Sequence, residues 1–282
     1  MARKPRIVGE ELYHHVYAWG NDRHPIFKQR SHYIRYLGYA GEYSKRYDVD
    51  LIAYALIWWH IHLFVFDLLG NLPRFMNSLH GRYAQYLNRS AGRVGHVFGE
   101  RYNNKVVEAN EYGLWLSRYI HRQPIELGLV ENPRDYEWTS HRAYMGLAPI
   151  GSLKPNVILD QFGRGKKGAE LFENFVTGAE DGPVDWNDAN SVIIGSSDFK
   201  DEIRLRTIRK TRGDVRSADL VELVAQRLGV EPGVISAPRG IEERRIRHNA
   251  FAILVDEYGF SLSEVARGIG VSATAVMKAV RK

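Results

Sequence analysis

Two histidines separated by one residue are the clearest chemical signal in the chain. His60 and His62 begin the run HIHLFVF, whose aromatic and β-branched residues predict a strand over 60–66. Side chains two apart on a strand share a face, so both imidazoles point the same way. Together they would form half of a site for a divalent ion, Mg²⁺ or Mn²⁺ among others. The same pattern also occurs as a pair of partly buried, hydrogen-bonded histidines.

A second chemical cluster lies further along, in the segment LSRYIHRQP at 116–124. Tyr119 and Gln123 are four residues apart, which makes them neighbours on one face of a helix. A phenol and an amide oxygen that project together could supply a nucleophile and a third metal ligand. The alternative for Tyr119 is a core tyrosine on an amphipathic helix, and the chain has 16 tyrosines to choose from.

The elements that must position these residues alternate between strands and helices. We expect strands over 12–19, 50–58 and 60–66 and an extended piece near 97–107, with helices over 29–47, 72–87 and about 111–121, the last ending before Pro124. The order β-α-β-β-α-β-α is typical of an α+β, ferredoxin-like fold, in which a mainly antiparallel sheet carries helices on one face.

Composition narrows the function classes. The 282 residues include no cysteine, which excludes a disulfide framework, a thiolate nucleophile and any cysteine zinc site. The net charge of +6 favours a polyanionic partner, of which nucleic acid is the commonest. No run approaches the ~20 apolar residues of a membrane helix, and the start of the chain lacks a secretory apolar region. We therefore expect a cytoplasmic protein with no membrane partner.

The amino-acid composition of the chain changes after residue 147. Gly-rich segments around a short helix, followed by a basic helical stretch, predict a linker and connection over 148–216. Residues 217–282 are predicted to form a compact helical module, with the capping and turn residues of a helix-turn-helix. Ser261 or Ser263 can cap one helix, Gly270 suits the turn, and Ser272 can cap the next. The would-be recognition helix carries Ser272, Thr274, Lys278 and Arg281. A purely structural three-helix bundle is the alternative.

Several segments, in order, resemble the single-tyrosine HUH transposases, in particular the REP-associated tyrosine transposases. The matching pieces are YHHV at 13–16, GNDR at 20–23, HIHL at 60–63, YAQYLN at 83–88, GHVF at 95–98, Arg101-Tyr102, RYIHRQP at 118–124, GLV at 128–130, DYEWTS at 135–140 and Ala143-Tyr144. Two places depart from the family pattern. Trp58-Trp59 stands where the family has Pro-Asn, and Gln123 stands where it has asparagine. Gln123 keeps the amide oxygen, and the tryptophans align with structural residues.

The resemblance implies a chemistry. Tyr119 would attack a backbone phosphorus of single-stranded, hairpin-associated DNA and become joined to the 5′ phosphate. His60, His62 and Gln123 would hold a divalent metal (Mg or Mn), and residues 1–147 would form the HUH catalytic domain. Arg23, Arg101 and Lys105 could contact phosphate. The expected setting is the bacterial cytoplasm, in association with the nucleoid, as a monomer or homodimer.

The C-terminal module also resembles the duplex-binding domain of the bacterial replication initiator, over roughly residues 219–282. Duplex DNA would then be a second partner. The arginines that would lie before or on the helix crossing the DNA backbone are Arg239, Arg244, Arg245 and Arg247.

Three functions from different classes fit these observations. The first, which the intact His60, His62, Tyr119 and amide at 123 favour, is a transposase or strand-transfer nuclease. The second is a domesticated, non-transposing DNA-binding regulator that retains the fold. The third is a metal-dependent hydrolase whose nucleophile is water, with Tyr119 structural. Only the first forms a covalent intermediate with DNA.

Overall fold

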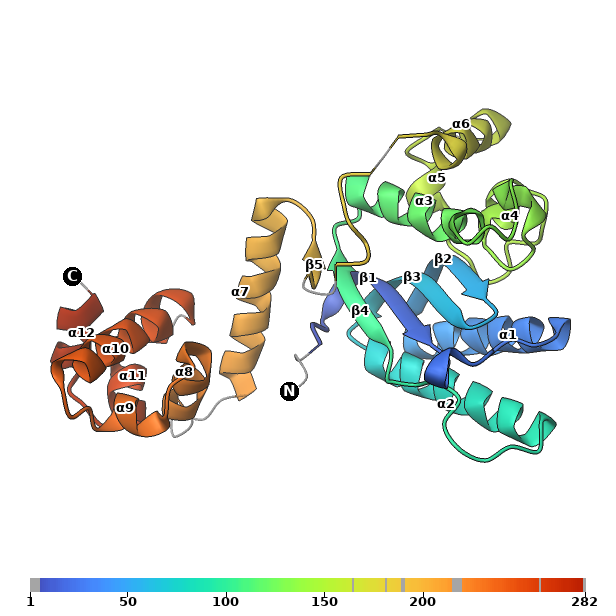
Figure 1. The fold of residues 1–282 in the computed structure, drawn as a ribbon. Coiled ribbons are helices and arrows are strands. Elements are labelled where there is room, and N and C mark those ends of the chain that lie inside the picture. The colour runs from blue at the N-terminus through green and yellow to red at the C-terminus, as the bar shows by residue number, and fades with distance from the viewer. Residues whose placement is uncertain are drawn as a thin grey trace. The chain divides into compact units, whose positions relative to one another are not determined.

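The computed structural model describes residues 6–163, 165–180, 182–188, 191–214, 220–258 and 260–280. The chain folds as two compact units, Met1–Ser196 and Ser197–Lys282. The first unit contains the sheet and the second is entirely helical over its described residues (Figure 1). No helix in these described ranges is long and apolar enough to span a bilayer.

A five-stranded sheet organises the first unit (Figure 1). Its strands are β1 (Glu10–Trp19), β2 (Val49–Ile57), β3 (His60–Leu69), β4 (Asn103–Val107) and β5 (Ile193–Ile194). Their spatial order is β2-β3-β1-β4-β5, with the first four antiparallel and β5 parallel to β4. The first four strands confirm the ferredoxin-like α+β fold, because β1 lies between β3 and β4.

Two long helices cover one face of this sheet. They are α1 (Arg30–Tyr47) and α2 (Leu72–Ser90). Along α2, Phe75, Leu79 and Tyr83 recur every fourth residue and are fully buried against the sheet core. The carboxylate of Asp67, at the end of β3, accepts hydrogen bonds from the backbone N–H groups of Asn71 and Leu72, both at 2.8 Å. A carboxylate there stabilises the helix N-terminus, so α2 starts directly after the strand.

The opposite face of the sheet is also covered. The helices there are α3 (Glu111–Glu126), α4 (His141–Tyr144), α5 (Asn156–Leu159) and α6 (Gly165–Thr177). Leu116 and Ile120 of α3 are fully buried with Phe64 of β3, and Phe172 of α6 joins the same core. The expectation of helices on one face therefore holds for α1 and α2, and a second helical layer lies behind the sheet.

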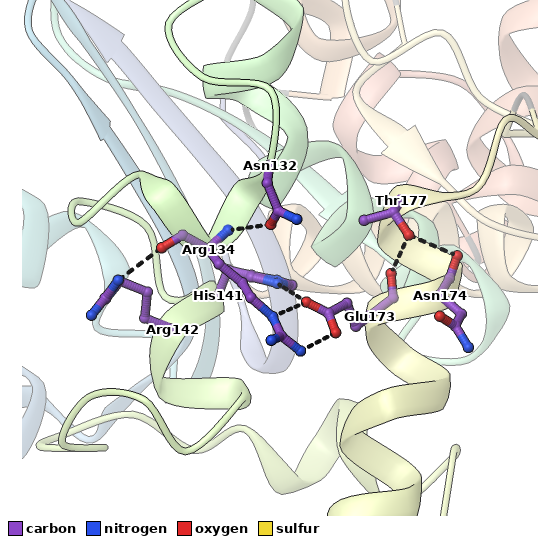
Figure 2. Close-up of polar contacts among 7 residues, drawn as sticks. All are labelled: Asn132, Arg134, His141, Arg142, Glu173, Asn174 and Thr177. Atoms are coloured by element: carbon purple, nitrogen blue, oxygen red, sulfur yellow. Dashed lines mark hydrogen bonds and ion pairs between the residues drawn. The ribbon is translucent and has the colours of Figure 1, made fainter.

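The described part of residues 148–196, expected as a linker, belongs to the first unit. Phe172 and Val176 of α6 are fully buried in it, and β5 extends the sheet. Figure 2 shows how α6 is fixed: Glu173 pairs with Arg134 and lies 3.8 Å from the buried His141. The boundary expected at residue 147 thus falls inside the first unit. The reason is that the apolar side of α6 is buried only when the helix packs against the back of the sheet.

Helix α3 continues past the proline at which it was expected to end. Pro124 lies within the helix, which reaches Glu126 before Gly128 adopts a left-handed φ of 66°. A proline this close to the C-terminal end removes a single backbone hydrogen bond, so the turn survives. The extra residues place Gln123 on regular helix, one turn after Tyr119.

The second unit consists of one long helix, α7 (Ser197–Asp214), followed by short helices, and the residues of its apolar core all lie between Leu220 and Val280. The short helices are α8 (Leu220–Leu228), α9 (Pro232–Ser236), α10 (Ile241–Ala252) with the π-helical turn η4 (Ile253–Glu257), α11 (Leu262–Ile269) and α12 (Ala273–Val280). Ser261 forms a capping box with Glu264 at the start of α11. Gly270 ends that helix with a φ of 77°, and Ser272 accepts a hydrogen bond from the N–H of Ala275.

Candidate functional site

The pairing of β1 with β3 brings histidines from both strands together. His62 lies opposite Tyr17 in the register, and His15 projects from the same face two residues earlier on β1. His15 Nε2 lies 2.9 Å from His62 Nδ1. The rings of His60 and His62 are 5.1 Å apart, and all three histidines are buried.

Helix α3 carries the two other predicted site residues to this histidine pair. Burial of Leu116 and Ile120 against the sheet orients the helix. The ring of Tyr119 then lies 5.5 Å from that of His62. Gln123 Oε1 lies 3.4 Å from His60 Nε2. The structure thus brings together all four residues that the sequence singled out from two distant segments.

The protonation states suit a metal site. Burial lowers the pKa of His60 to about 4 and that of His62 well below its ordinary value, so both imidazoles are neutral at pH 7. Neutral imidazole is the form that binds a metal ion. Among the described residues, no group of three or more His, Cys, Asp or Glu side chains could hold one. A metal at the histidine pair would therefore take the amide oxygen of Gln123 as its third protein ligand.

Tyr119 is held as a neutral phenol. Burial raises its pKa to about 12, although the hydrogen bond with Gln123 acts in the opposite direction. Its hydroxyl donates to Asn187 Oδ1 at 3.3 Å, and its ring lies 5.9 Å from that of Trp186. A cavity of about 380 Å³ opens beside the phenol, lined by α3 on one side and by residues 179–180, 182 and 184–187 on the other.

Lys105 supports the segment that covers Tyr119. It was expected to contact phosphate, yet the side chain is only 2% exposed. Its ammonium donates to the carbonyl oxygens of Trp186 at 2.8 Å and Asp188 at 2.7 Å. Desolvation lowers the Lys105 pKa, and the nearby Asp188 and Asp185 oppose that shift. In this structure the residue therefore positions Trp186 against the site instead of facing solvent.

Two arginines of α3 hold the end of α6 beside the same cavity. Arg118 Nε donates to the carbonyl oxygen of Phe175 at 2.6 Å, and Arg122 Nη1 donates to those of Val176 at 3.0 Å and Gly178 at 3.2 Å. Cations at a helix C-terminus satisfy carbonyl groups that have no partner within the helix. These bonds hold the last turn of α6 and the adjoining Gly178 against α3.

The other residues expected to bind DNA lie in two groups. In the first unit, Arg23 and Arg101 are exposed, and the guanidinium of Arg23 lies 5.6 Å from the ring centroid of Trp59, next to His60. In the second unit the exposed ones are Arg239, Arg244, Arg245, Ser272, Thr274 and Lys278. Arg247 is half-buried over Phe251, and Arg281 lies outside the described residues.

Sequence reasoning missed three residues that touch the site. His15 could have been noticed, since Tyr13, His15 and Tyr17 alternate on one face of the expected strand. No comparable pattern marks Trp186 or Asn187, because both lie in a Gly- and Asp-rich segment that reads as an exposed connection.

The sequence and the fold were compared with those of known proteins. No curated protein matches the sequence. The solved structures that resemble the chain include two transposases. One is a REP-associated tyrosine transposase bound to a REP hairpin, with 14% identity and a TM-score of 0.44, covering 54% of this chain and 90% of that one. The other, described as a transposase of Deinococcus radiodurans, shows 16% identity and a TM-score of 0.31, covering 43% and 98%. Residues 9–123, which span the sheet and the helix of Tyr119, match the family model of IS200-like transposases. This part of the chain is therefore similar to the IS200-like transposases.

Proposed function

We propose that the first unit cuts single-stranded, hairpin-associated DNA through a covalent 5′-phosphotyrosine at Tyr119. The observation that carries this is the meeting of one phenol, two neutral imidazoles and one amide oxygen at a single point. A phenol buried only to fill a core would have no reason to face polar groups from two strands and a loop.

The chemical step is a displacement at phosphorus. The Tyr119 oxygen forms a bond to the phosphorus and loses its proton, while the bond to the 3′ oxygen breaks and that oxygen becomes a hydroxyl. Because the phenol is neutral in the free protein, a nearby cation must favour its ionised form. A divalent ion on His60, His62 and Gln123 would supply that charge and polarise the scissile phosphate.

Strand transfer follows from the same bond. The phosphotyrosine conserves the energy of the broken phosphodiester, so a later attack by a 3′ hydroxyl can reseal DNA without ATP. This distinguishes a transposase from a hydrolase whose nucleophile is water and whose product is free.

The experiment is to incubate the full chain with a labelled, hairpin-bearing single strand and Mn²⁺ and look for a covalent adduct. We expect Tyr119→Phe to abolish the adduct while DNA binding remains, and EDTA to abolish it in the unaltered protein. Tyr112→Phe, on the first turn of the same helix, is the matched control and should retain it. An adduct that survives Tyr119→Phe would move the nucleophile elsewhere, and turnover without any adduct would support the hydrolase.

We propose in addition that the second unit binds duplex DNA through α11 and α12. Its support is the geometry between these helices: the capping box at Ser261, the left-handed Gly270 and the capped start at Ser272. Ser272 and Thr274 are exposed at the start of α12, and Lys278 is exposed in its last turn. This is the arrangement in which a second helix can enter a major groove.

A further inference from the structure

Three tryptophans gather where the sheet ends beside the histidine pair. Trp19 is the last residue of β1 and lies opposite His60, and Trp58 and Trp59 form the turn between β2 and β3. Trp19 is 39% exposed and Trp58 is 44% exposed. Large aromatic side chains that face solvent next to a polar site are typical of a surface that binds a ligand or another macromolecule.

The backbone of these tryptophans is rigidly held. The carbonyl oxygen of Trp58 accepts hydrogen bonds from the N–H groups of Ile26 at 2.8 Å and Phe27 at 2.9 Å. That of Trp59 accepts from Gly20 at 2.8 Å. A Cβ at Gly20 would lie 2.0 Å from the carbonyl oxygen of His24, so this loop packs as closely as glycine allows. The rings are thus presented by a fixed support, and little ordering is needed when a ligand binds.

A continuous series of rings joins this surface to the nucleophile. Trp59 lies 4.3 Å from His60, centroid to centroid, and Trp19 lies 5.3 Å from Tyr17. Tyr17 in turn lies 6.2 Å from His62, which faces Tyr119. Arg23 adds a positive charge over Trp59. A ligand that reaches Tyr119 along this edge must offer flat apolar faces together with negative charge.

We propose that Trp19, Trp58 and Trp59, with Arg23, form a stacking platform for unpaired bases that flank the phosphate attacked by Tyr119. Unpaired bases offer flat π-faces, and their phosphates match the arginine. The identity of the strand that lies here rests on the proposed function, whereas the aromatic platform itself does not. Stacking accepts every base, so the platform would supply affinity and direct the strand without reading its sequence.

The test measures equilibrium binding with full-length Tyr119→Phe protein, which lacks the proposed nucleophile. Two fluorescent strands are compared: an unstructured single strand, and the same strand in which abasic residues replace all bases but keep all phosphates. Trp19→Ala and Trp58→Ala should each weaken binding of the normal strand by about five- to 100-fold. Neither should change binding of the abasic strand, and Trp19→Phe and Trp58→Phe should restore most of the loss.

Leu69→Ala provides the matched control. Leu69 is 51% exposed and lies on the same strand as His60, at the opposite end. The substitution Leu69→Ala therefore removes exposed apolar surface that is remote from the site. It should leave both strands unaffected.

Two results would overturn the platform. One is an equal loss for the normal and the abasic strand, which would mean a contact with phosphate or a structural effect. The other is unchanged binding together with a change of oligomeric mass by light scattering, which would make the surface an interface between copies. Adduct formation by the protein that retains Tyr119 tests the proposed function separately. If no adduct forms but binding still depends on the bases, the cleavage proposal is wrong and the platform proposal remains supported.

Discussion

At the scale of single residues, the site consists of groups kept neutral by burial. The imidazoles of His15, His60 and His62 and the phenol of Tyr119 all have pKa values moved by desolvation away from their charged forms. Neutral imidazoles keep a lone pair for a metal, and a neutral phenol is a weak nucleophile until a cation is near. If the site holds a metal as proposed, the same burial would couple metal binding to activation of Tyr119.

His15 has a distinct part in this arrangement. Its Nε2 and His62 Nδ1 are 2.9 Å apart and share one hydrogen. If His62 Nδ1 carries that hydrogen, the lone pair of His62 Nε2 is free for a metal. We expect His15→Ala to weaken divalent-ion binding by roughly 10- to 100-fold, and His15→Gln, whose amide oxygen can accept the hydrogen, to recover much of it.

Calorimetric titration with Mn²⁺ would measure these affinities without any DNA. His14→Gln is the control, because His14 is equally buried on the same strand but faces the other side of the sheet. If His15→Ala leaves Mn²⁺ affinity unchanged, His15 contributes only to packing and does not support the metal ligands.

At the scale of elements, the site depends on a strand, a helix and a covering segment that lie far apart in sequence. The periodicity of strand and helix predicted that His60 and His62 share one face and that Tyr119 and Gln123 share another. The structure confirms both placements. The alternation along the first strand places His15 on one face with Tyr13 and Tyr17, but its contact with His62 could not be foreseen, because the register of β1 on β3 is a long-range property. Residues 148–196 were misjudged because their short helices bury apolar residues only against the back of the sheet.

Lys105 provides the test of that covering segment. Lys105→Met removes two hydrogen bonds to the carbonyl groups of Trp186 and Asp188, so the segment over Tyr119 should loosen. We expect faster amide hydrogen exchange over residues 184–188, with protection in β1 and β3 retained.

Arg101→Met is the matched control for Lys105→Met, since it removes an exposed cation from the stretch that precedes β4. It should leave exchange over 184–188 unaltered. If Lys105 instead contacts DNA phosphate, Lys105→Met would lower the salt dependence of strand binding by about one unit, an outcome that contradicts the buried position.

At the scale of the whole molecule, buried histidines should make the first unit sensitive to acid. Burial lowers the pKa of His80 to about 3, whereas the unfolded chain takes up that proton near pH 6.5. The folded state then binds fewer protons below pH 6.5, so stability is full above that value and declines as pH falls toward 3. The same direction holds for His14, His15, His60, His62, His121 and His141.

His80→Gln should reduce this pH dependence by about one proton, or ~1.4 kcal/mol per pH unit between pH 6 and 4.5. Denaturant unfolding at several pH values would measure the slope. Tyr36→Phe, which removes only the hydroxyl 3.2 Å from His80, should shift the stability while keeping the slope. Parallel curves for His80→Gln and the unaltered chain would show that His80 does not contribute.

The division into two units determines how recognition and chemistry should be separated. A chain ending at Leu147, where the sequence suggests a boundary, would lose α5, α6 and β5 and expose the core beneath Tyr119. The informative truncation ends at Ser196. We expect residues 1–196 to cut a generic hairpin strand and to lose preference for a particular target, while Ser197–Lys282 binds duplex DNA without the first unit.

Gel shifts of Ser197–Lys282 at several salt concentrations would test the duplex interface. Arg244→Ala removes an exposed cation at the start of α10, so it should weaken binding to all sequences and reduce the salt slope by roughly one unit. Lys278→Ala, on α12, should instead relax preference at one base pair, at a cost of ~1–3 kcal/mol there. Ile241→Ala, 81% exposed and uncharged on α10, should change neither. If the fragment binds no duplex at low salt, and the chain ending at Ser196 selects targets as the full chain does, then α11 and α12 serve only to complete a helical core.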